Sequence, residues 1–133
     1  MYIASMTVED MERGPDPKIV VQPSWNDVES ALSRMDGNRR SIVTLDAPGD
    51  DCGFMGIGGG ENGVYVCFVI DADGDEIRLI DPTVASHDTF EVYMGQTNVR
   101  SKNEAVDLIT ILAVAKTYAE SGELNGDYAW GTV

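Results

Sequence analysis

The segment Val64–Ile70 constrains the fold more than any other part of this chain. Its seven residues, Val-Tyr-Val-Cys-Phe-Val-Ile, are almost continuously apolar and are rich in β-branched and aromatic side chains. Such side chains favour extended backbone. A half-exposed strand alternates apolar and polar residues, whereas a strand buried on both faces is apolar throughout. The segment therefore predicts a central strand, Val64–Asp71, that other elements cover on both sides.

Shorter patterns predict further strands around this one. Two turn signals, Asn62-Gly63 and Asp73-Gly74, lie on either side of the central segment and are typical of antiparallel hairpins. Strands joined by such short turns form a meander. The other predicted strands are residues 1–11, taken as an edge strand, together with Ser41–Asp46, Cys52–Ile57, Glu76–Ile80 and Thr89–Met94.

Two segments carry helix signals. Ser24 and Asp27 form a capping pair, and Trp25, Val28, Leu32 and Met35 follow at helical spacing, with Gly37 expected just beyond the helix end. A second capping pair, Ser101 and Glu104, predicts a long helix that ends near Ser121 and Gly122. The order of helix, strand meander and helix predicts one α+β domain over residues 1–133, an antiparallel sheet with an N-terminal and a long C-terminal helix packed on it.

The charge of the chain limits its partners. The net charge is −14, and the stretch from Ser41 to Ile77 holds eight carboxylates and no Lys or Arg. Direct binding to nucleic acid or to an anionic membrane is disfavoured, because both need clustered cations. The simplest interpretation is that the acidity serves solubility, and the alternative is a cationic partner. With no signal peptide or spanning segment recognised, we expect a cytoplasmic protein with reduced cysteines.

The glycine cluster inside that acidic stretch matches a phosphate-binding pattern only by its letters. Gly58-Gly59-Gly60-Glu61-Asn62-Gly63 fits G-x-G-x-x-G. The dinucleotide fingerprint needs a helix directly after the loop, and here a strand is predicted instead. The surrounding carboxylates would also repel a phosphate. The cluster is therefore interpreted as a hairpin connection, in which glycine allows the close approach of another backbone.

No metal, cofactor or catalytic site is predicted. Asp71-x-Asp73-x-Asp75 imitates the start of a calcium loop, but Glu76 and Pro82 stand where that loop needs Gly and Glu. Two cysteines with one histidine, His87, do not make a zinc motif. A solvated turn is the favoured interpretation of the aspartates, and nothing in the pattern requires an enzyme.

Several short motifs, taken in order, resemble the first numbered immunity-protein family of bacterial polymorphic toxin systems. The resemblance covers roughly Pro23 to Trp130. It rests on Trp25, Leu32-Ser33-Arg34-Met35-Asp36-Gly37, Val43-Thr44-Leu45, Ile57-Gly58-Gly59-Gly60, Gly63-x-Tyr65-Val66, Gly95-Gln96, Ala119-Glu120-Ser121-Gly122-Glu123-Leu124 and Trp130. Many relatives carry two glycines before the Gln, where this chain has Met94-Gly95. The resemblance implies that the motif residues define the fold: Trp25, Gly58, Gly59, Gly60, Gly63, Gly95, Gln96 and Trp130.

The resemblance also implies a function: binding and neutralising a cognate toxin, often a nucleic-acid deaminase, by covering its active site or substrate cleft. Such a toxin has a basic surface, so acidic residues are the candidate contacts. Two alternatives stay open: a small-molecule-binding or enzymatic domain that uses the glycine loop and carboxylates, and a structural homodimer subunit. The candidate toxin-binding residues are Asp50, Asp51, Glu61, Asp71, Asp73, Asp75 and Glu76.

Overall fold

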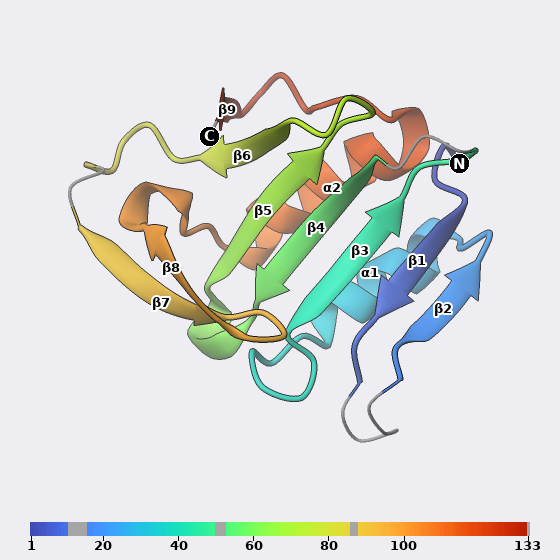
Figure 1. Cartoon of the computed structure of the whole chain (residues 1–133), viewed down its shortest axis with the longest axis horizontal. Coiled ribbons are helices and arrows are strands. Elements are labelled where there is room, and N and C mark those ends of the chain that lie inside the picture. The colour runs from blue at the N-terminus through green and yellow to red at the C-terminus, as the bar shows by residue number, and fades with distance from the viewer. Residues whose placement is uncertain (11–15, 50–52, 86–87, 133) are drawn as a thin grey trace.

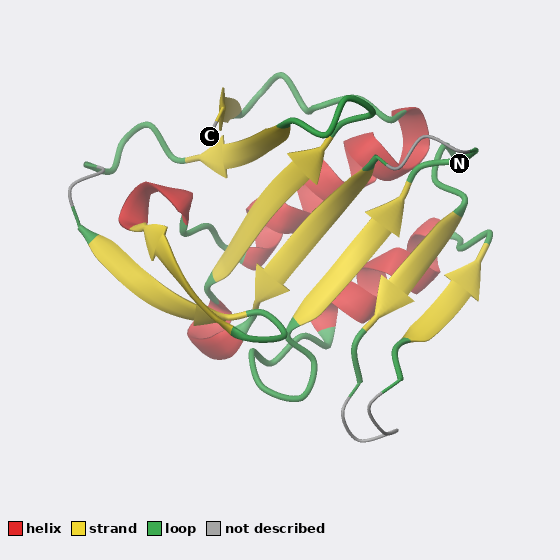
Figure 2. Cartoon of the chain, viewed as in Figure 1, coloured by secondary structure: helices red, strands yellow, loops and turns green. Residues whose placement is uncertain are grey.

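The computed structural model of the protein describes residues 1–10, 16–49, 53–85 and 88–132. In this part of the chain, two α-helices lie behind a seven-stranded antiparallel sheet, and a separate two-stranded hairpin lies in front of it (Figure 1). Figure 2 shows how strands dominate the front of the molecule and helices the back. The predicted α+β class, with both helices packed on an antiparallel sheet, is confirmed.

The large sheet has the strand order β2-β1-β3-β4-β5-β6-β9, and every neighbouring pair is antiparallel. Strands β3 to β6 form the predicted meander. The bounds of the seven strands are β1 Ser5–Val8, β2 Lys18–Val21, β3 Ile42–Asp46, β4 Phe54–Gly59, β5 Tyr65–Ile70, β6 Glu76–Ile80 and β9 Ala129–Thr132.

The central strand β5 is covered on both faces, as its apolar sequence predicts. Tyr65, Cys67 and Val69 point to the main core, which they share with both helices. Val66 points the other way, into a small second core with Val92 and Met94 from the hairpin. Because successive strand residues alternate between faces, a strand apolar at every position requires both layers.

Helix α1 (Trp25–Ser33) begins where its capping pair predicts. The Asp27 N–H donates to the Ser24 hydroxyl oxygen at 3.2 Å, and the Ser24 N–H donates to the Asp27 carboxylate at 2.9 Å. Val28 and Leu32 are fully buried against the sheet. The predicted helix-ending role of Gly37 is wrong: Arg34 already caps the helix in an ordinary helical conformation. Gly37 instead lies in the following loop, with its backbone pressed against Glu61.

Helix α2 (Leu108–Ser121) starts later than predicted. The Ser101–Glu104 capping box exists, but it closes a short 3-10 helix, η2 (Lys102–Glu104). The backbone of Val106 then leaves the helical path to exchange two 2.9 Å hydrogen bonds with Tyr65. Asp107 is the true N-cap of α2, and Gly122 ends it as predicted, with φ +74°. None of the helices in the described ranges has the length and apolar character needed to cross a membrane.

Three strands are not anticipated by the sequence. β2 pairs with β1, so the first predicted strand is not at the edge of the sheet. β8 (Thr97–Ser101) pairs with β7 (Thr89–Tyr93), and together they leave the large sheet to form the front hairpin. β9 pairs with β6 and carries Trp130, which packs against the main core. Trp130 therefore holds β9 against the body of the protein.

We expect the Cys67 thiol to resist alkylation while the protein is folded. Cys67 is buried on β5, and burial raises the pKa of its thiol because a thiolate would lose its hydration. In a Cys52→Ser variant, iodoacetamide labelling at pH 8 should be at least about 1000-fold slower in buffer than in denaturant, because it requires an opening of the sheet. Mass spectrometry of timed samples measures this. Similar rates in both solutions would contradict the two-layer cover of β5.

Candidate interaction surface

The glycine cluster Gly58–Gly60 fixes three chain segments at one end of the sheet. A side chain on Gly58 would collide with Met94 of the hairpin, its Cβ lying 2.6 Å from the Met94 Cβ. Gly60 has φ +115° and lies against the Met35 carbonyl in the loop after α1. The chain then turns through a short 3-10 helix, η1 (Glu61–Gly63), and enters β5. The interpretation of the cluster as a hairpin connection is confirmed, and close backbone approach occurs at Gly60.

The tip of the β7–β8 hairpin is attached to the large sheet through a buried serine. The Gly95 N–H donates to the Ser41 hydroxyl oxygen at 2.8 Å, and that hydroxyl donates to the Glu9 carboxylate at 2.6 Å. The Met94 N–H donates to the Gln96 carbonyl and closes the turn. The Gly95-Gln96 pair therefore shapes a turn whose backbone contacts the sheet.

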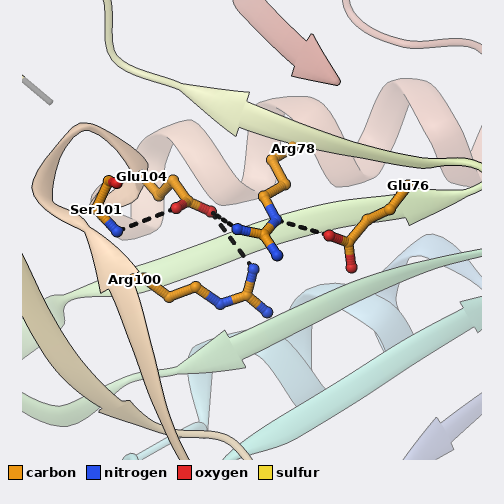
Figure 3. Close-up of polar contacts among 5 residues, drawn as sticks. All are labelled: Glu76, Arg78, Arg100, Ser101 and Glu104. Atoms are coloured by element: carbon orange, nitrogen blue, oxygen red, sulfur yellow. Dashed lines mark hydrogen bonds and ion pairs between the residues drawn. The ribbon is translucent and has the colours of Figure 1, made fainter. Parts of the chain in front are cut away.

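Further along the hairpin, an ion-pair cluster joins β8 and η2 to β6 (Figure 3). The Glu104 carboxylate is buried and lies 3.5 Å from the guanidinium nitrogens of both Arg78 and Arg100, while the Ser101 N–H donates to it at 3.1 Å. Arg78 also donates to Glu76 at 2.7 Å. Two carboxylates thus neutralise two arginines across the junction between the hairpin and the sheet.

Arg100 also lies over an aromatic ring of the central strand. Its guanidinium carbon is 5.8 Å from the centroid of the Phe68 ring, within the range of a cation–π contact. The Phe68 ring itself occupies the space that a side chain on Gly56 would fill. Of this cluster, the sequence analysis singled out only Ser101 and Glu104, and it interpreted them as the cap of a helix and not as part of an ion-pair cluster.

To the side of the hairpin, the front face of the sheet is open and polar at its centre. The Asp46 carboxylate accepts hydrogen bonds from the hydroxyls of Ser5, Thr7 and Thr44 at 3.1–3.2 Å. Beyond them, β2 ends the sheet with Ile19 and Val21 exposed. This half of the front face offers hydrogen-bonding groups and two exposed apolar side chains.

The predicted acidic contacts do not form one patch. Asp71, Asp73 and Asp75 lie together in the turn between β5 and β6, with ligand oxygens within 4.8 Å of one another. The Asp71 carboxylate accepts the N–H groups of Asp73 and Asp75, so it stabilises the turn. Glu76 opens β6 beside them and pairs with Arg78.

Glu61 is exposed at the other end of β5, in η1, and is therefore separated from this turn by the length of the strand. A six-residue strand spans about 17–20 Å. Asp50 and Asp51, like Cys52 and His87, lie outside the described residues. The end of their connection is placed, however: an ideal Cβ on Gly53 would lie 3.3 Å from the Ile70 carbonyl oxygen, next to the acidic turn.

Comparison with known proteins places the chain in a family. A search of curated proteins finds no significant match. The family model for the immunity protein Imm1 matches residues 17–132, which include both helices, the strands β2 to β9 and all the glycine and tryptophan positions described above. A match over most of the chain establishes the family. The chain belongs to the Imm1 family of immunity proteins.

Proposed function

We propose that this protein neutralises a cognate bacterial toxin by binding it and covering its active site or substrate cleft. The observation that carries the proposal is the match to the Imm1 immunity family over residues 17–132. Inhibition by occlusion requires no chemistry from the inhibitor, so the protein would act as a binding partner and not as an enzyme. A tight protein–protein contact buries about 1,600 Å² in total, which a domain of this size can supply.

We further propose that the toxin acts on nucleic acid, with a deaminase as the first candidate, and that the two proteins meet in the cytoplasm. An enzyme that binds DNA or RNA presents clustered cations to the phosphates. A protein with a net charge of −14 is complementary to such a surface. Complementary fields accelerate association and select against wrong partners.

The acidic turn between β5 and β6 is the proposed first contact. Asp73 and Asp75 are exposed and Asp71 is half-buried, so three carboxylates of one turn project from one end of the sheet. Glu76 adds its charge beside Arg78. Asp50 and Asp51 lie outside the described residues, and we assign them to the toxin contact on their charge alone. Glu61, at the opposite end of β5, would act on the toxin through longer-range attraction.

Co-expression with the toxin domain encoded beside this gene tests the function. We expect survival of the host only when this protein is present, and a complex that co-purifies. Toxicity that is unchanged by the protein, with no complex formed, would refute the immunity role for that toxin.

A triple variant, Asp71→Asn, Asp73→Asn and Asp75→Asn, tests the contact surface. Asparagine keeps a side-chain oxygen that can accept the hydrogen bonds within the turn but removes three charges. We expect association with the toxin to slow by about tenfold at low ionic strength, and the difference to shrink as salt screens the attraction. Stopped-flow or surface binding kinetics measures this.

A matched control removes the same charge from the helical side of the molecule. Glu29, Glu120 and Glu123 are all exposed, and their change to Gln should slow association much less if the turn faces the toxin. Equal slowing in both triple variants would mean that only the net charge matters and would remove the turn from the contact.

A further inference from the structure

A groove lies between the end of β6, the start of α2 and the segment that leads into β9. Its volume is about 500 Å³, and its walls are largely apolar, with Ile80, Val106 and Tyr128 among them. This volume is typical of a site that takes a bulky side chain or a small ligand. None of the candidate contacts predicted from the sequence lies in its lining.

Three carboxylates from separate segments line the same groove. Asp81 follows β6, Asp107 caps α2, and Asp127 precedes β9, so residues far apart in sequence come together here. Among the described residues that line the groove, none is a Lys or Arg. The groove therefore has apolar walls and three negative charges, and no cationic side chain in its lining neutralises them.

The local hydrogen bonds keep two of these carboxylates ionised. The Thr83 hydroxyl and backbone N–H donate to Asp81 and hold its pKa below the usual range. The Thr110 backbone N–H, with its hydroxyl, does the same for the pKa of Asp107. A general acid needs a raised pKa near neutral pH, so these groups suit the pairing of a cation better than the donation of a proton.

We propose that this groove is a docking site for an arginine-bearing segment of the toxin. Charge complementarity selects the occupant: the aliphatic stem of arginine packs on apolar walls while its guanidinium meets carboxylates. Arginine fits better than lysine because its charge is less strongly hydrated and its planar fork can bind carboxylates with two parallel hydrogen bonds. The inference rests on the proposed function, since the occupant belongs to the toxin.

The charge test is the triple variant Asp81→Asn, Asp107→Asn and Asp127→Asn. Asparagine is also a good helix N-cap, so Asp107→Asn should leave α2 in place, which thermal unfolding checks. We expect the toxin to dissociate about 100-fold faster, because removing one side of a desolvated charge pair acts mainly on dissociation. The acidic-turn triple variant, which removes the same charge, should change association and leave dissociation nearly unaltered.

A steric variant tests occupancy without changing charge. Ala105 lines the groove and is half-buried, so Ala105→Tyr should fill part of the space and also accelerate dissociation of the purified toxin domain. Dissociation unchanged in both groove variants, while the wild-type protein still binds the toxin, would overturn the groove and leave the immunity role intact. A wild-type protein that fails to bind the toxin would instead refute the proposed function.

Discussion

Gly60→Ala should lower the free energy of unfolding by about 2–6 kcal/mol, one of the two largest losses we expect from a single substitution in this protein. Gly60 has φ +115°, which side-chain-bearing residues rarely adopt. An added Cβ would lie 2.8 Å from both the carbonyl carbon and the oxygen of Met35. The backbone strain and the collision each cost about 1–3 kcal/mol. Because the obstacle is backbone, it cannot rotate away, and Tm should fall by roughly 10 °C.

Gly63→Ala is the matched control in the same turn. Gly63 also has a positive φ, +73°, but an added Cβ would meet no atom within 4 Å. The substitution should therefore cost only the strain of a left-handed residue, about 1 kcal/mol. Denaturant unfolding of both variants measures the difference. Equal losses would mean that the contact between Gly60 and Met35 does not determine the stability of this end of the sheet.

The elements that can be predicted from the sequence are those whose structure is decided by residues close together in the chain. Local hydrogen bonds are enough to predict the helix start at Ser24 and Asp27. An unbroken hydrophobic pattern is enough to predict the central strand at Val64–Ile70. β9 is different: Ala129–Thr132 includes a glycine, and only pairing with β6 makes it a strand. Lys18–Val21 is four residues long and likewise depends on pairing with β1.

The capping box of Ser101 and Glu104 was predicted correctly but was assigned to the wrong helix. The capping box forms as predicted, but a second cap at Asp107 starts the long helix, and the intervening Val106 pairs with β5. Neither the groove nor the full ion-pair cluster could be predicted from the sequence. Their charged groups come from segments that only the folded sheet brings together, and no spacing in the sequence records their proximity.

Glu104→Gln should cost about 3 kcal/mol of unfolding free energy, because it removes the buried negative charge between two arginines. The side chains of Glu104 and Arg100 are each 8% exposed, so water cannot replace the lost partner. Glutamine keeps the shape and can still accept the Ser101 N–H, which isolates the charge as the cause. Hydrogen exchange should rise more in β7 and β8 than in β1 and β3, because the cluster joins the hairpin to the sheet.

Two variants separate this explanation from general charge effects. Glu76→Gln removes a carboxylate from the same cluster, but the side chains of Glu76 and Arg78 are 26% and 27% exposed, so we expect a loss of at most about 1 kcal/mol. Arg100→Met combined with Glu104→Gln leaves no unpaired charge at the most buried position and should recover more than half of the loss. If the double variant were no more stable than Glu104→Gln alone, the cost would lie in packing, and the hairpin would be held by Val92 and Met94 and not by charge.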